Sequence, residues 1–270
     1  MPRTTPTGAR ARPLRRAAVG AALAAGAVIL TACGAGPVAA PRSSATPTPT
    51  NGTVLDVAVP TGTASLPLVA EDGRTVTLAS FVGKTVVLVD FLTLCQEICP
   101  LTSANMAAVS AAVEKAGLSQ DVMILETTVD PWRDDVTHLE AYQKLFGAVP
   151  HWSFLTGSPA DIAALWKSFG VATERNVITE KPAPKDWYTG APLTYDIDHQ
   201  DVVIVIGPDG HERWLVNGTP SISAPSTVPS TLQSFLSADG LANESAPPDP
   251  AWTAADVEAA VAFVTGHSIG

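Results

Sequence analysis

A continuous apolar run, Thr85 to Leu92 (TVVLVDFL), constrains the fold of this chain more than any other feature. The run is rich in β-branched residues and lacks the alternation of apolar and polar residues that marks a half-exposed strand. Runs of this kind form strands whose two faces are both covered. The sequence therefore predicts a strand in the interior of a sheet that helices cover.

The segments around this run alternate between helical and strand patterns. Helical spacing of apolar residues predicts helices at residues 101–116, 136–146 and 162–169, and further strands are predicted at residues 122–129 and 152–155. Turn residues predict a hairpin within residues 69–78 and a second hairpin that pairs residues 201–206 with 213–216. This order predicts an α/β fold with a mixed central sheet, covering helices and an N-terminal β-hairpin.

Residues 1–33 have the pattern of a lipoprotein signal peptide. A basic segment precedes the apolar run Ala17 to Leu30, which is shorter than the roughly 20 residues a membrane-spanning helix needs. The run ends in Leu30-Thr31-Ala32-Cys33-Gly34, which resembles a bacterial lipobox in which Cys33 receives the lipid. An ordinary cleaved signal with an incidental cysteine is the alternative, and the sequence leaves open Sec or twin-arginine export.

The rest of the chain divides by composition into three parts. Residues 34–53 are mostly Ala, Pro, Ser and Thr and predict a disordered linker. Residues 54–243 contain the predicted domain, and residues 244–270 form a C-terminal tail with a short helix that Thr253 caps. We expect an exported protein that a lipid holds on the cell membrane, facing the extracytoplasmic side.

The charge balance excludes one large class of partners. The whole chain has a net charge of -10, and five arginines precede Cys33, so the remainder has 11 basic against 26 acidic residues, a net charge of -15. A surface this acidic repels phosphate backbones, so we expect no nucleic-acid partner. Metal ions and cationic partners are compatible with it.

Two of the three cysteines lie where the buried strand meets the next helix, in Cys95-Gln96-Glu97-Ile98-Cys99-Pro100. Proline is favoured at the first position of a helix, so Cys99 is expected at or beside the N-cap. The N–H groups and the dipole at that end stabilise anions, which favours the thiolate form of both cysteines. Thiolates bind metals or attack disulfides.

Spacing alone leaves several functions open for this pair. A structural disulfide is common in exported proteins. A redox dithiol is a second reading, although such motifs usually have two intervening residues. A peroxiredoxin-like activity fits less well, because peroxide reduction centres on a single attacking thiol.

One of the five histidines differs from the others in its position. His199 precedes the predicted strand at residues 201–206, where thioredoxin-like redox proteins generally have a proline. The other four are most simply surface residues: His138, His151, His211 and His267. Two soft thiolates and an imidazole suit copper better than hard cations, and a structural zinc site would need a fourth ligand.

The chain resembles the Sco/SenC family of copper-binding, thioredoxin-fold proteins, which assist assembly of cytochrome c oxidase. The resemblance begins with Thr93-Leu94-Cys95-Gln96-Glu97-Ile98-Cys99-Pro100, which is similar to the family pattern Thr-x-Cys-Pro-Asp-x-Cys-Pro. It continues over residues 66–240 through Val129-Asp130-Pro131, Arg133-Asp134, Leu155-Thr156-Gly157, Phe169-Gly170-Val171, Asp198-His199 and Pro208-Asp209-Gly210. Gln96 and Glu97 depart from the usual proline and aspartate.

The resemblance implies that Cys95, Cys99 and His199 bind copper as Cu(I) or Cu(II). It implies a membrane-anchored metallochaperone that passes copper to the copper-binding subunit of cytochrome c oxidase. The alternative is a thiol-disulfide oxidoreductase that keeps oxidase cysteines, or other exported cysteines, reduced through Cys95 and Cys99. Whether the protein is an enzyme depends on which of these holds.

Three acids in matching motifs, Asp130, Asp134 and Asp198, are expected to contact the ligands or a partner. The alternative for Asp130 and Asp134 is helix capping or plain solvation. Residues 175–194 read as a long loop inserted before His199, which we expect to cover the site or to meet the partner.

Overall fold

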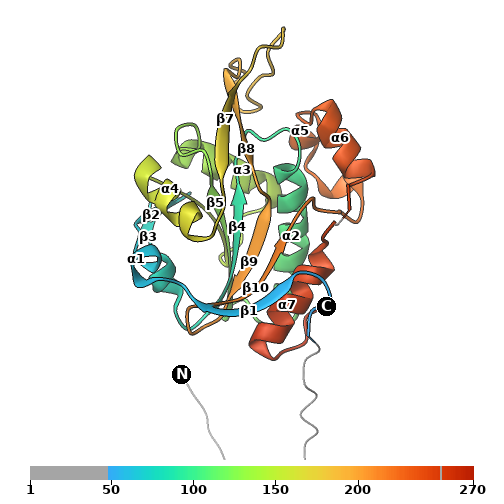
Figure 1. Cartoon of the computed structure of the whole chain (residues 1–270). Helices are drawn as coiled ribbons and strands as arrows, with labels where there is room; N and C mark the ends of the chain where they lie inside the picture. The colour runs from blue at the N-terminus through green and yellow to red at the C-terminus, as the bar shows by residue number, and fades with distance from the viewer. Residues whose placement is uncertain (1–47, 250) are drawn as a thin grey trace, which may run out of the picture. The chain divides into compact units, whose positions relative to one another are not determined.

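An eight-stranded mixed sheet forms the centre of the part of the chain that the computed structural model describes, residues 48–249 and 251–270 (Figure 1). The strands follow the order β1-β10-β9-β4-β5-β6-β2-β3, in which β5 pairs parallel with β4 and β6 and the other pairs are antiparallel. Their bounds are β1 Thr53–Ala58, β2 Leu68–Ala70, β3 Thr75–Val76, β4 Thr85–Phe91, β5 Val122–Thr128, β6 Trp152–Gly157, β9 Val202–Ile206 and β10 His211–Asn217. A separate antiparallel pair consists of β7 Thr173–Val177 and β8 Tyr195–His199.

The central strand is the one that the apolar run predicts. Every residue of β4 is buried, and β4 lies between β5 and β9. Neighbours on both sides satisfy its backbone hydrogen bonds, so β4 carries its C-terminal end, and the cysteines that follow, on a rigid support.

Helices pack on this sheet. Their bounds are α1 Thr61–Ala64, α2 Cys99–Lys115, α3 Val136–Phe146, α4 Pro159–Ser168, α5 Ser230–Gln233, α6 Ala238–Ser245 and α7 Ala254–Thr265, with single 3-10 turns at Leu78–Phe81 and Pro225–Thr227. The side chains of Asp135, Ser158 and Thr253 cap α3, α4 and α7 by accepting backbone N–H groups. None of the helices in the described residues is long and apolar enough to cross a membrane.

The predicted α/β order is confirmed, together with the N-terminal hairpin of β2 and β3 and the later hairpin of β9 and β10. Three strands were missed, namely β1, β7 and β8. The expected long loop at residues 175–194 is wrong at its start, because β7 runs to Val177 and pairs with β8. All five residues of β7 are exposed, so no alternation could signal it. The edge strand β1 was also missed, since its partner β10 is distant in the sequence.

The helix expected near the C-terminus is present as α7, and it is part of the main core. Val257, Ala260 and Val261 are fully buried, as is Trp252 just before the helix. The helix packs against α2, β4 and β9. The signal peptide, Cys33 and residues 34–47 of the expected linker lie outside the described residues.

A carboxyl group lies in this core at Glu126 on β5. Its oxygens accept hydrogen bonds from the Ser103 hydroxyl at 2.6 Å and from the Trp152 indole N–H at 3.1 Å. Burial disfavours the charged form and raises the pKa of Glu126 to about 8, although the two hydrogen bonds oppose the shift. The carboxyl is therefore mostly protonated in the folded protein at neutral pH.

We expect the stability of the protein to fall as Glu126 titrates. The ordinary pKa of the carboxyl is 4.5 and its folded value is about 8, so the folded state holds an extra proton between these values. The free energy of unfolding then falls with rising pH across that window, by up to about 1.4 kcal/mol per pH unit. In urea titrations, Glu126→Gln should reduce the slope by the contribution of Glu126, and Glu114→Gln on the exposed face of α2 should leave the slope unchanged. Equal slopes in the wild type and in Glu126→Gln would contradict the assignment.

Candidate functional site

The two cysteines lie at the end of the sheet to which β4 points. The chain leaves β4, turns through residues 92–98 and enters α2, whose first residue is Cys99 and whose N-cap is Ile98. Pro100 occupies the first turn of the helix, as the sequence predicts. The expectation that Cys99 lies beside the N-cap is confirmed.

Both cysteines are free thiols with little exposure to solvent. Cys95 is 8% exposed and Cys99 is fully buried. The backbone N–H of Cys99 donates to the Cys95 sulfur at 3.4 Å, so the first turn of α2 directs a donor at that sulfur. Two sulfurs from one turn therefore share the N-terminus of one helix.

The two thiols differ in acidity, which corrects the expectation of two thiolates. A hydrogen bond from the Cys99 thiol lowers the pKa of Cys95 to about 7, and the nearby charge of His199 favours the same thiolate. Burial raises the pKa of Cys99 well above its usual range, and the Cys95 sulfur raises it further. Near neutral pH we therefore expect Cys95 to ionise before Cys99.

His199 meets these sulfurs from the end of β8. Its Nε2 lies 3.7 Å from Cys99 Sγ, and its side chain is 3% exposed. Its Nδ1 lies 2.9 Å from an Asp90 carboxylate oxygen and 2.9 Å from the Gln200 carbonyl oxygen. Because both of these neighbours are acceptors, Nδ1 carries the hydrogen and Nε2 is the nitrogen that faces the thiols.

Asp90 is a member of the site that the sequence analysis missed. This residue of β4 is fully buried, and its second oxygen accepts the backbone N–H of Val202 at 2.8 Å. Burial lowers the pKa of His199, but the hydrogen bond and charge of Asp90 outweigh it and raise that pKa to about 10. The signal was a single acid inside the apolar run of residues 85–92, since a buried charge needs a partner.

A second buried acid, Asp201, lies two residues after His199. The Thr102 hydroxyl of α2 contacts both of its carboxylate oxygens, at 3.2 and 3.3 Å. Burial raises the pKa of Asp201 well above its usual range, and the charge of Asp90 raises it further. Asp201 thereby links the chain beside His199 to the helix that begins at Cys99.

The three acids that the sequence proposed have different surroundings. Asp130 and Asp134 are fully buried, so they are not solvated, and the residue that caps α3 is Asp135. Asp134 accepts hydrogen bonds from Thr93 and Thr128, and burial raises its pKa to about 6. It thus fixes the chain just before the cysteine motif.

Asp130 and Asp198 belong to the surroundings of β8. Asp130 accepts the Tyr195 hydroxyl at 3.0 Å and pairs with Arg133. Asp198 is exposed and accepts the Asn176 amide at 2.8 Å, across the pair of β7 and β8. Neither acid contacts a sulfur or the imidazole through a hydrogen bond in the described residues.

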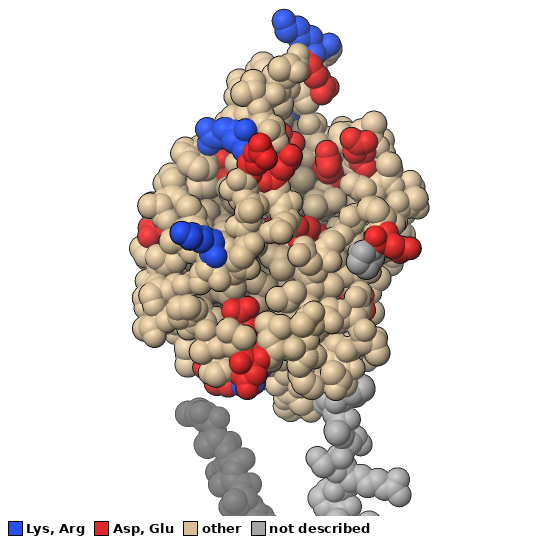
Figure 2. Space-filling model, viewed as in Figure 1, with Lys and Arg blue, Asp and Glu red and all other residues tan. Residues whose placement is uncertain are grey.

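Acidic side chains surround the approach to the thiols. Burial raises the pKa of Glu97, and the charges of Asp239, Asp196 and Asp198 raise it further. Figure 2 shows acidic side chains gathered just below the projecting pair of β7 and β8. Acidic side chains therefore lie near Glu97 of the cysteine motif.

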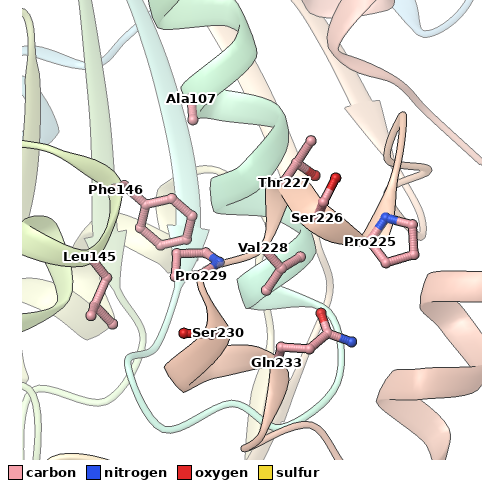
Figure 3. Close-up of a pocket in the computed structure, with 10 residues that line it drawn as sticks. All are labelled: Ala107, Leu145, Phe146, Pro225, Ser226, Thr227, Val228, Pro229, Ser230 and Gln233. Atoms are coloured by element: carbon pink, nitrogen blue, oxygen red, sulfur yellow. The ribbon is translucent and has the colours of Figure 1, made fainter.

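A cavity of about 670 Å³ lies away from the thiols (Figure 3). Its lining comes from α2, the end of α3 and the segment that leads into α5: Ala107, Leu145, Phe146, Pro225, Ser226, Thr227, Val228, Pro229, Ser230 and Gln233. It contains none of the cysteines or histidines, so the candidate site is the thiol cluster and not this cavity.

The thiol cluster is not arranged as a preformed metal site. Across residues 48–249 and 251–270, no three His, Cys, Asp or Glu side chains already occupy metal-coordinating positions. The two sulfurs and Nε2 instead form a hydrogen-bonded group at one point. The donor types and their convergence fit a soft metal ion.

These features define an α/β protein with a buried dithiol at a helix N-terminus and a carboxylate-bound histidine facing it. The sequence profile of the SCO1/SenC family matches residues 61–228, which is more than half of the chain. The chain belongs to the SCO1/SenC family, and its fold is thioredoxin-like.

Individual relatives agree with this assignment. The chain is 31% identical to a mitochondrial SCO2 homolog of Danio rerio over 143 residues, which cover 53% of this chain and 47% of that protein. It is 31% identical to the SCO1 homolog of Bacillus subtilis over 152 residues, which cover 55% of this chain and 69% of that protein. The match thus spans about half the length of the mitochondrial relative.

Solved structures of Sco proteins also align with the chain. ScoI of Arabidopsis thaliana, a structure with copper bound, is 28% identical and aligns over 56% of this chain and 85% of that one, with a TM-score of 0.47. BsSco, described as a member of the Sco family of cytochrome c oxidase assembly proteins, is 26% identical and aligns over 62% of this chain and 86% of that one, with a TM-score of 0.45.

We expect Cys95 to react with alkylating reagents before Cys99. Cys95 is the more exposed thiol and has the lower pKa, so iodoacetamide should label it at least about tenfold faster near neutral pH. Tandem mass spectrometry of the reduced protein places the label on one residue or the other. Equal rates, or faster labelling of Cys99, would contradict the described geometry.

Proposed function

We propose that this protein is a copper metallochaperone that binds one copper ion through Cys95, Cys99 and His199. The observation that carries the proposal is the orientation of His199. Its Nδ1 is held by Asp90 on the central strand while its Nε2 lies 3.7 Å from Cys99 Sγ. A histidine that binds a metal typically donates its other ring N–H to a carboxylate in this way.

The donor set supports copper over other metals. Two thiolate sulfurs and one imidazole are soft and borderline ligands, which suit copper, whereas Ca²⁺ and Mg²⁺ require oxygen ligands. A structural zinc ion would take four ligands, and the side chains that meet here supply two sulfurs and one nitrogen. The assignment of copper therefore rests on the residues of this chain.

Each residue has a defined part in holding the ion. Cys95 provides the thiolate that is available near neutral pH, and Cys99 provides a second sulfur after losing its proton on binding. Asp90 holds the Nδ1–H of His199, so that Nε2 faces the ion and binds it after losing its own proton. The near-complete burial of these side chains limits the access of water and of competing ligands to the copper.

We infer that the copper serves assembly of the copper centre of cytochrome c oxidase, with the copper-binding subunit of the oxidase as partner. Family membership supports this role, because the Sco family includes cytochrome c oxidase assembly proteins. The thiol-disulfide oxidoreductase reading gains no support from the comparisons. It also does not require an imidazole held beside the thiols.

The site of action follows from the N-terminal sequence. We propose export and lipid attachment at Cys33, which would hold the domain on the extracytoplasmic face of the cell membrane. The Pro-rich sequence between Cys33 and the first strand, which begins at Thr53, would let the domain approach a membrane-embedded oxidase.

Loss of any one ligand should abolish tight copper binding. In titrations of the reduced protein, the wild type is expected to bind one equivalent, and Cys95→Ser, Cys99→Ser and His199→Ala should each bind at least about 100-fold more weakly. With Cu(II), the thiolate charge-transfer absorption should disappear in both serine variants. His211→Ala, at the first residue of β10, is a histidine control that should bind normally.

The same variants separate the two functional readings. Unchanged copper affinity in His199→Ala would refute the three-ligand site. Reduction of a target disulfide by His199→Ala at the wild-type rate, together with weak copper binding by the wild type, would favour the oxidoreductase.

The lipid anchor has a separate test. Cys33→Ala removes the residue that would carry the lipid, so we expect the exported protein to move from the membrane to the soluble fraction after cell fractionation. Copper binding by the purified variant should stay normal, because Cys33 precedes the domain. Retention of Cys33→Ala on the membrane would contradict the lipid anchor.

A further inference from the structure

We propose that the C-terminal segment from Pro229 to Ser245 clamps the cysteine loop, which consists of residues 92–98 between β4 and α2. Gln96 and Gly240 are then positioning residues for the copper site. The segment consists of α5, α6 and the residues between them, and it lies beyond residue 228, where the family match ends. The inference rests on the proposed copper site for its functional meaning. The contact itself is independent of any metal.

Gln96 is held by this segment from two sides. Its backbone carbonyl oxygen accepts the N–H of Ser237 at 2.9 Å, and its side-chain amide donates to the Phe235 carbonyl oxygen at 3.1 Å. These two bonds join residues about 140 positions apart in the chain, directly beside Cys95. Both the backbone and the side chain of one loop residue are thereby fixed to the segment.

Gly240 permits the close approach of α6 to the loop. A Cβ at this position would collide with the Gln96 carbonyl oxygen and lie 3.2 Å from the Glu97 Cα atom. These neighbours are backbone atoms, which cannot move aside as a flexible side chain can. Glycine is therefore required here by contact with the cysteine loop, and not by a left-handed backbone conformation.

The clamp also contacts the residue before Cys95. Phe235 packs with Leu94 and Leu193 in a small apolar cluster that is separate from the main core. Leu94 and Gln96 thus hold the chain on either side of Cys95, and both are held by the same segment. Figure 1 shows α5 and α6 at the end of the domain where α2 begins.

On its other side the segment is anchored to the main core through the buried Leu232 and Leu236. The cavity in Figure 3 separates its start, at Pro229, Ser230 and Gln233, from α2 and α3. The segment is therefore a fixed support for the cysteine loop. We infer that the loop opens by parting from this segment, and that this opening controls access to Cys95.

The test is the rate at which iodoacetamide labels Cys95 in the reduced, copper-free full-length protein. Gly240→Ala and Gln96→Ala should each raise this rate about fivefold or more, since loss of one hydrogen bond shifts a local opening equilibrium by about that factor. In the copper-loaded variants, copper should pass to a chelator faster by a similar factor, and the Cu(II)-thiolate absorption should shift.

Two controls separate the clamp from general destabilisation. Gly62→Ala makes the same chemical change in α1, where an added Cβ has no neighbour within 4 Å, and should leave labelling unchanged. Val261→Ala creates a cavity under the fully buried face of α7, and should lower the melting temperature without raising the Cys95 labelling rate under native conditions.

Labelling of Cys95 within twofold of the wild type in both Gly240→Ala and Gln96→Ala would overturn the proposal. Equal acceleration in Val261→Ala would also overturn it, because general destabilisation would then explain the effect. If Gly240→Ala does not fold, Gln96→Ala alone decides. If the wild type fails to bind copper, the proposed function fails, but the labelling of the copper-free protein still decides the clamp.

Discussion

The pairing of Asp90 with His199 is the interaction on which the site depends. Asp90 lies fully buried in the central strand, where a carboxylate without partners would cost several kcal/mol. Its partners are the His199 ring and the N–H of Val202, at the start of β9. Satisfying this buried charge therefore fixes the end of β8 relative to the sheet. The contact between Asp90 and His199 therefore contributes both to the stability of the core and to the orientation of the imidazole.

The sulfurs depend on several segments that meet at the end of β4. Thr93 is held by Asp134 from the loop before α3, and its carbonyl oxygen accepts the Trp187 indole N–H at 2.7 Å. Gln96 is held by the C-terminal segment. A short stretch of chain thus receives contacts from three regions that are distant in the sequence, which restricts the conformations available to Cys95 and Cys99.

Local patterns predicted the parts of this arrangement but not its connections. The apolar run, the helical spacing and the proline after Cys99 are local signals, and they were sufficient for the central strand, the cysteine loop and the helices α2, α3, α4 and α7. The short helices α1, α5 and α6 were not predicted. The partner of His199 lies 109 residues away, and Gln96 meets its partner 139 residues away. Such pairs become apparent only once the fold brings the two residues together. The single acid within residues 85–92, Asp90, was nevertheless a signal, because a buried charge needs a partner. The exposed strand β7 carried no alternation of apolar and polar residues that could predict it.

The proposed release of copper requires one side of a nearly closed site to open. Breaking the Asp90 to His199 pair would leave a buried charge without its partner, at a cost of about 3–5 kcal/mol. Opening the cysteine loop from the C-terminal segment breaks two neutral hydrogen bonds to Gln96, each contributing about 1 kcal/mol. The contacts between loop and segment are neutral, so opening the loop leaves no buried charge without a partner. With His199 still held by Asp90, an incoming partner thiolate would reach the copper from the side of Cys95.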